Sequence, residues 1–149
     1  MSASDVFISY SRTDAEFVRR LHAHLEARQK AVWVDFEDIP PASRWADELK
    51  RAIEASNTFA FVISQASVSS PECRKELDYA VQLNKRIIPL RLRDIGQAEL
   101  PEPLSAHNWV PQTGLFEEHF DEAFEVLNSA IETDLDWVRQ HTVKDPTPS

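Results

Sequence analysis

Short apolar stretches alternate along the chain with longer stretches of helical periodicity. The short ones cover residues 6–10, 31–35, 58–64 and 86–92, and their β-branched and aromatic residues predict four strands. Residues 58–64 show little polar alternation, which is typical of a central parallel strand covered on both faces. Pro89 lacks a backbone N–H and predicts an irregularity or a position near the sheet edge. Residues 108–110 are the candidate for a short fifth strand.

Helical spacing of apolar residues predicts a helix after most of these strands. The first begins at Thr13 or Asp14 and runs to about residue 30, the second is capped by Ser43 and ends near residue 56, and the third has Pro71 in its first turn and reaches residue 83. Residues 36–43 and 65–70 are predicted loops. The last helix is predicted over residues 115–131, with one apolar stripe for packing on the sheet: Phe116, Phe120, Phe124, Leu127 and Ile131. Strands that alternate with helices predict an α/β fold with a parallel sheet and right-handed crossovers.

Composition narrows the class of protein. The 149 residues carry a formal net charge of -9, which opposes binding to the phosphate backbone of nucleic acids. A single cysteine excludes an internal disulfide framework and favours a reducing, cytoplasmic setting. Secretory-signal features are missing at the start, no apolar run approaches the roughly 20 residues that span a bilayer, and the histidines have no metal-ligand spacing. Neither of the two glycines belongs to a phosphate-binding motif, so any nucleotide site has to work without a glycine-rich cradle.

Candidate chemistry gathers in the segments that follow the strands. In parallel α/β sheets, ligands bind outside the carboxyl ends of the strands, near the point where strand order reverses. Glu76 lies early in the helix after the third strand, next to Arg74 and Lys75, and is expected to stay ionised at neutral pH. An anionic carboxylate suits the positive ribose centre that develops when NAD loses nicotinamide. The same pattern also fits a helix carboxylate paired with nearby basic side chains.

Other residues in these segments have two interpretations each. Trp45 either anchors the core or presents its ring to a nicotinamide or adenine base. Arg12 and Arg44 either neutralise a pyrophosphate or are solvated. Cys73 has no His partner in the pattern, which favours a small buried residue over a nucleophile.

Four blocks of sequence resemble one known family in the right order. Residues 5–11 (DVFISYS) resemble the first-strand signature of Toll/interleukin-1 receptor (TIR) domains, and residues 37–45 (EDIPPASRW) resemble the loop after the family's second strand. Residues 61–64 resemble its third strand, and residues 73–77 with 84–89 resemble its next helix and strand. The resemblance is to TIR domains of bacterial type. It implies a three-layer, flavodoxin-like fold over residues 1–133, with a five-stranded parallel sheet in the order 2-1-3-4-5, and an extension or linker to a downstream module over residues 134–149.

The resemblance also implies an activity. Many bacterial, plant and animal TIR domains cleave NAD when they self-associate, and their catalytic glutamate lies in a Lys-Glu pair that matches Lys75 and Glu76. The chain is thus expected to be an NAD hydrolase in bacterial signalling or immunity, which releases nicotinamide and gives ADP-ribose or a cyclised derivative. NAD is its substrate, no cofactor or metal is expected, and other TIR domains are its expected partners, without nucleic acid or membrane. The expected substrate-binding residues are Ser9, Tyr10, Ser11, Arg12, Asp35, Arg44, Trp45 and Cys73.

Two departures from the family pattern leave a rival function open. Ala42 stands where related loops commonly carry glycine, and Glu72 stands where some active members carry a tryptophan one helical turn before the catalytic glutamate. The rival is a non-enzymatic TIR module that binds another TIR domain without processing nucleotide. The surroundings of Glu76 distinguish the two. In the enzyme, Glu76 faces an open cleft beside Trp45 and Arg12, and in the interaction module it is capped by neighbouring side chains.

Overall fold

The chain folds into strands and helices that follow one another closely along the sequence. The computed structural model describes residues 4–34, 42–96, 99–105 and 109–143, and of residues 42–46 and 136–143 it describes the backbone alone. The elements, in chain order, are β1 (Ser4–Ser9), η1 (Arg12–Asp14), α1 (Ala15–Ala27), β2 (Val32–Trp33), α2 (Ala42–Ala55), β3 (Ser56–Ile63), α3 (Gln65–Val68), α4 (Pro71–Gln82), β4 (Arg86–Arg91), α5 (Glu102–Ser105), η2 (Phe116–His119) and α6 (Phe120–Val143).

The strands form one parallel sheet in the order β2-β1-β3-β4. Where a fifth strand was expected, Val110 makes a single parallel bridge to Leu90. Its N–H donates to the carbonyl of Pro89 at 2.9 Å, and its carbonyl accepts from the N–H of Arg91 at 2.8 Å. The parallel direction and the order of the first four strands are therefore confirmed, but the described residues contain four strands instead of five. Pro111 follows the bridge at once and brings no donor that could extend the ladder.

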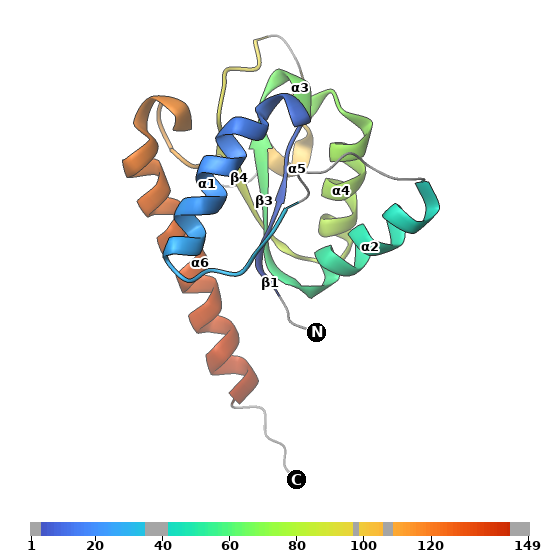
Figure 1. Cartoon of the computed structure of the whole chain (residues 1–149), viewed down its shortest axis with the longest axis vertical. Coiled ribbons are helices and arrows are strands. Elements are labelled where there is room, and N and C mark those ends of the chain that lie inside the picture. The colour runs from blue at the N-terminus through green and yellow to red at the C-terminus, as the bar shows by residue number, and fades with distance from the viewer. Residues whose placement is uncertain (1–3, 35–41, 97–98, 106–108, 144–149) are drawn as a thin grey trace.

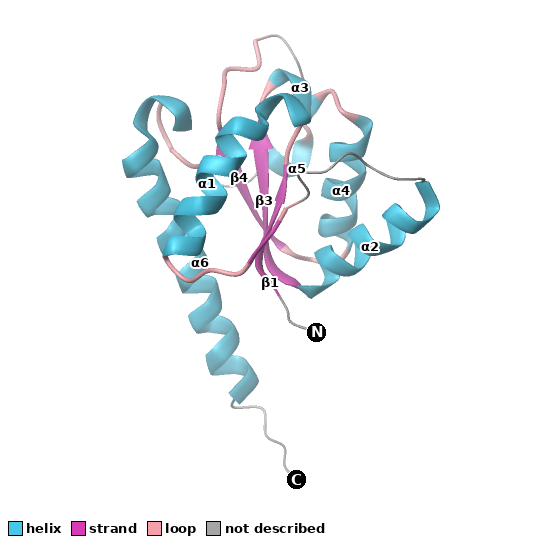
Figure 2. Ribbon diagram, in the orientation of Figure 1, coloured by secondary structure: helices cyan, strands magenta, loops and turns pink. Residues whose placement is uncertain are grey.

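Helices cover both faces of this sheet, so the molecule has the expected three layers (Figure 1). Val6 and Ile8 of β1 pack with α1 and α6, whereas Phe7 between them packs with α2 and α4. The same alternation continues in β3, where Ala60 and Val62 pack on the same face as Val6 and Ile8, toward α1 and α6. Figure 2 shows the strands enclosed between two groups of helices, with the end of α6 extending past the sheet.

Pro89 lies where the sequence predicted, near the edge of the sheet. It is paired in register with Phe61 inside β4, the last full strand. Its carbonyl points away from β3, toward Val110. Because the N and C=O of one strand residue point to the same side, the missing N–H removes no hydrogen bond from the β3–β4 ladder.

A short helix, α3, replaces part of the loop predicted over residues 65–70. Ser64 Oγ accepts from the N–H of Ser67 at 3.2 Å, and Ser67 Oγ accepts from the N–H of Ser64 at 2.9 Å. This capping box satisfies backbone groups at the start of the turn. The serines that suggested an irregular loop are therefore the residues that stabilise a helical turn.

The last helix differs from the prediction at both ends. Residues 116–119 form the separate 3-10 helix η2, and α6 begins at Phe120. The predicted apolar stripe is buried as expected: Phe116, Phe120, Phe124, Leu127 and Ile131. The helix α6 does not end at residue 131 but continues to Val143, across the predicted boundary at residue 133. There, Asp134 accepts a hydrogen bond from Thr58 Oγ1 at 2.9 Å and pairs with Arg86 at 3.3 Å. The helix was predicted from the spacing of apolar residues, and these contacts are made by polar side chains. The spacing therefore did not show that the helix continues. The division of the chain at residue 133 stays a prediction.

Among the helices of the described ranges, none combines the length and the apolar character that a membrane-spanning helix requires.

Candidate active site

A cavity of about 270 Å³ lies beside β1 and α4, at the side of the sheet where strand order reverses. The chain leaves β1 for β2 on one side and later returns to β3 on the other. The cavity receives side chains from β1, the segment after it, β2, α2 and α4. Its lining consists of Phe7, Ile8, Tyr10, Ser11, Arg12, Thr13, Trp33, Leu49, Ser70, Glu72, Cys73 and Glu76.

Glu76 is held in the wall of this cavity by the end of β1. Its Oε1 accepts a hydrogen bond of 2.6 Å from Ser9 Oγ, and Ser9 is buried as the last residue of β1. Ser70 caps α4 and Pro71 occupies its first turn, so Glu76 lies in the second turn of a helix whose start is well defined. The carboxylate is half-buried, lines the cavity together with Arg12, and is also held by a neighbouring hydroxyl. Glu76 thus lines a cavity beside Arg12 and is also hydrogen-bonded by Ser9, whereas the side chain of Trp45 lies outside the described residues.

Cys73 lies one helical turn before Glu76 and is buried as the sequence predicted. Burial raises the pKa of its thiol from the ordinary 9.0 to about 11, and the charges of Glu76 and Glu72 act in the same direction. A hydrogen bond with Ser70 opposes this shift in part. The sulfur is therefore a neutral thiol at physiological pH, and the cavity holds a carboxylate without a competing thiolate.

We expect the Cys73 thiol to resist alkylation in the folded protein. With a pKa near 11, the thiolate fraction at pH 8 is about a hundredfold below that of an unfolded cysteine with a pKa of 9.0. Labelling by iodoacetamide at pH 8, followed by mass spectrometry with and without urea, measures the ratio. The stability that the neutral thiol contributes is complete below pH 9 and is lost as the pH rises toward 11, because the unfolded thiol ionises first. Equal labelling rates in the two states would contradict the assignment.

The segment after β1 brings three further expected residues to the cavity, Tyr10, Ser11 and Arg12. Ser11 caps η1 by accepting from the N–H of Thr13 at 3.4 Å, and the two hydroxyl groups lie 2.8 Å apart. The side chain of Arg12 is exposed. The cavity thus combines one guanidinium group with the carboxylate of Glu76.

The structure does not describe the side chains of three predicted substrate-binding residues. Asp35 lies outside the described residues, as do the side chains of Arg44 and Trp45, whose backbone belongs to the first turns of α2. Trp33 and Leu49, which lie before and after these positions in the sequence, both line the cavity.

Trp33, Ser70 and Glu72 line the cavity although the sequence analysis did not include them as binding residues. The indole of Trp33 stacks on Phe7, with ring centroids 4.9 Å apart and planes at 5°. The register that pairs these two residues across β1 and β2 is what brings the indole to the site. A position two residues before the end of the second strand was the available signal, because side chains at the carboxyl ends of strands surround such sites.

A larger cavity, of about 1030 Å³, lies away from these residues. It runs along β4, residues 109–113 and α6, and none of the predicted site residues lines it. Size alone therefore does not select the functional cavity in this fold. In the part of the chain that the structure describes, no group of three or more His, Cys, Asp or Glu residues could hold a metal ion.

Comparison with known proteins identifies the family of the chain. The family model of the TIR domain matches residues 6–127. The chain belongs to the TIR-domain family. The match includes most of β1, the residues that line the candidate site and most of the apolar stripe of η2 and α6. No curated protein matches this TIR domain.

Solved structures of other TIR domains resemble it. The TIR domain of the Toll-related receptor TRR-2 from Hydra magnipapillata has 28% sequence identity and a TM-score of 0.67, and the match covers 87% of this chain and 98% of that one. A TIR-STING receptor from C. gigas has 25% identity and a TM-score of 0.60, over 83% of this chain and 40% of the receptor. The TIR domains of the activated Roq1 resistosome share 24% identity with a TM-score of 0.52, over 59% of this chain and 57% of that one, which shows likeness of fold alone.

Proposed function

We propose that this TIR domain cleaves nicotinamide from NAD, with Glu76 as the central carboxylate and with activity switched on by self-association. The observation that supports the proposal is the position of Glu76. Its carboxylate is oriented by Ser9 in a cavity at the strand switch point, and Arg12 lines the same cavity. The product is ADP-ribose or a cyclised derivative.

The reaction requires little from the protein besides charge and orientation. The bond between ribose C1′ and the nicotinamide nitrogen breaks, and its electron pair neutralises the pyridinium ring. Positive charge develops on the ribose, where the anionic Glu76 stabilises it. Water then adds to C1′ and releases a proton, which completes hydrolysis. Attack by a group of the same substrate gives the cyclised product. NAD is the substrate in this scheme, and no cofactor takes part.

The neighbours of Glu76 suit the remaining parts of the substrate. Ser9 Oγ donates to one carboxylate oxygen and thereby holds the orientation of the group. In the proposed complex, Arg12 offsets the charge of the pyrophosphate and Trp33 supplies aromatic surface for a base.

The volume of the cavity limits how much of NAD it can hold. At about 270 Å³ it is smaller than the 300–1,000 Å³ of typical small-molecule pockets, and NAD is a large ligand. The described cavity therefore accommodates the nicotinamide end of NAD. The rest of the dinucleotide needs surface from the segment between Trp33 and Leu49 or from a second copy of the chain.

A non-enzymatic interaction module is the second candidate, and Glu72 favours it. This exposed carboxylate lines the same cavity as Glu76. A second negative charge weakens the attraction for a pyrophosphate, and Glu72 offers no ring on which a base could stack. In that function, the domain binds other TIR domains and leaves NAD intact.

Nicotinamide release distinguishes the two functions. Concentrated or artificially clustered protein is incubated with NAD, and nicotinamide is followed by chromatography for the wild type, Glu76→Ala and Asp78→Ala. Asp78 lies on the same helix but is exposed and paired with Arg74 at 3.1 Å, so its variant is the matched control. We expect release by the wild type and the control, rising with protein concentration as mass action requires. If clustered wild type releases no more nicotinamide than Glu76→Ala, the interaction module is the function.

A further inference from the structure

The short helix η1 separates the candidate active site from a second cavity. Thr13, its middle residue, lines both. Arg12 lines the candidate site, whereas Asp14 lines the second cavity, which measures about 630 Å³ and also receives Arg93. The position of this one helical turn therefore sets the position of Arg12 relative to Glu76.

Asp14 connects η1 to the ends of two other strands. Its side chain is only 1% exposed. One carboxylate oxygen accepts a hydrogen bond of 2.6 Å from Ser64 Oγ, at the end of β3, and the other accepts one of 3.0 Å from Arg93 Nη1, after β4. A buried carboxylate with two such donors is strongly stabilised in one place, because any displacement leaves a charge without compensation in a medium of low dielectric constant.

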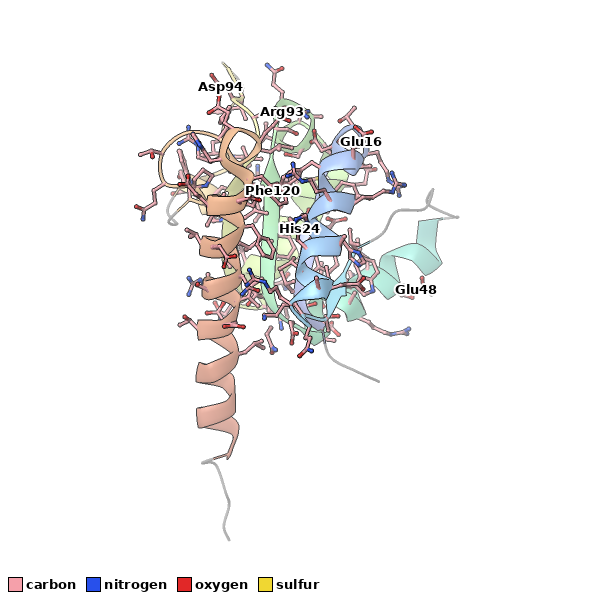
Figure 3. All side chains as sticks on the ribbon, turned by 60° about the vertical axis from the view of Figure 1, so that its left-hand side comes forward. Glu16, His24, Glu48, Arg93, Asp94 and Phe120 are labelled. Carbon is pink, nitrogen blue, oxygen red and sulfur yellow. The ribbon has the colours of Figure 1, made fainter. Side chains whose placement is uncertain are left out.

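Arg93 is itself held from two further directions. Its Nη2 donates to Glu117 Oε1 in η2 at 3.0 Å, and its backbone N–H donates to the carbonyl of Ile63 at 3.2 Å. Figure 3 shows Arg93 at the same end of the molecule as Glu16, which lies in the first turn of α1. The guanidinium group thus links η1 to η2, and the backbone N–H of the same residue joins them to the end of β3.

We propose that Asp14 and Arg93 are positioning residues for the candidate active site, where their ion pair holds η1 so that Arg12 lies along the cavity. This inference rests on the proposed cleavage of NAD. Glu76 and Ser9 belong to α4 and β1, which are held by the core and the sheet independently of η1. Loss of the ion pair therefore weakens substrate binding more than it slows bond cleavage.

The test compares Arg93→Met, Arg93→Lys and Arg28→Met under the clustered conditions in which the wild type is assayed. Arg28 pairs with Glu125 at the surface, between the end of α1 and α6, and does not line the candidate site, so its variant is the control for loss of an arginine ion pair. We expect Arg93→Met to raise KM for NAD about tenfold with kcat within about twofold, Arg93→Lys to restore most of the affinity, and Arg28→Met to behave as wild type. A variant that merely reduced the folded fraction would lower the apparent kcat and leave KM unchanged.

Asp14→Asn provides a second variant if Arg93→Met does not fold. The amide has the size of the carboxylate and can still accept from Ser64, but it lacks the charge that pairs with Arg93. Backbone hydrogen exchange in either variant is expected to rise at residues 11–14 and to stay unchanged in β1. An unchanged KM or unchanged exchange at residues 11–14 overturns this inference while the proposed function stands. If clustered wild type neither cleaves NAD nor binds it in titration calorimetry, the proposed function and this inference fail together.

Discussion

Glu76→Gln is expected to lower the rate of nicotinamide release by about a hundredfold or more, the range seen when one preorganised electrostatic group is removed from an active site. Glutamine has nearly the size of glutamate, and its carbonyl oxygen can accept the 2.6 Å hydrogen bond from Ser9. The substitution therefore keeps the packing of α4 against β1 and removes only the charge. In the proposed reaction the positive charge moves from the pyridinium ring to the ribose, so the carboxylate acts more strongly on the transition state than on the bound substrate. The loss should appear in kcat, with KM changed much less.

Asp78→Asn is the control for this experiment. It removes the same charge from the same helix at an exposed position, where Asp78 pairs with Arg74. We expect its rate to stay within about twofold of the wild type, because exposed helix pairs contribute little and are screened by salt. Circular dichroism confirms that both variants are folded. Equal losses in the two variants, or a fall of only a few fold in Glu76→Gln, would remove Glu76 from the mechanism.

Phe116→Ala should lower the free energy of unfolding by about 3–5 kcal/mol, which is the usual cost of a large cavity in a core. The ring of Phe116 is fully buried where η2 joins α6. It packs edge to face with Phe17, at a centroid distance of 5.2 Å, and with Phe120, at 5.4 Å. Truncation therefore removes two aromatic contacts in addition to the buried area. Urea unfolding followed by circular dichroism gives the difference.

Val126→Ala is the comparison substitution, in α6, the helix that follows η2. Val126 is 50% exposed, so its truncation should change the free energy of unfolding by no more than about 0.5 kcal/mol. If Phe116→Ala costs no more than Val126→Ala, the aromatic stripe of α6 does not supply the stability that its burial indicates.

Strand order alone predicted which residues of the candidate site lie near one another. Parallel strands bring their carboxyl ends to one edge, so Ser9, Arg12 and Glu76 could be expected near one another from their places after β1 and β3. The hydrogen bond between Ser9 and Glu76 could not, because it joins residues 67 positions apart and depends on the angle of α4. Trp33 was missed for a similar reason: only the pairing of β2 with β1 shows that its ring stacks on Phe7.

The sequence by itself determined the four strands and the main helices between them, their order and the parallel direction of the sheet. These follow from interactions between residues close in the chain, such as the cap of Ser70 on α4 and the helical spacing of Phe116, Phe120 and Phe124. Only the tertiary structure decided that Val110 adds a single bridge to the four-stranded sheet of the described residues, and that Asp14 meets Arg93. Contacts of this kind join distant parts of the chain. Their geometry depends on how whole helices and strands pack, which no local pattern contains.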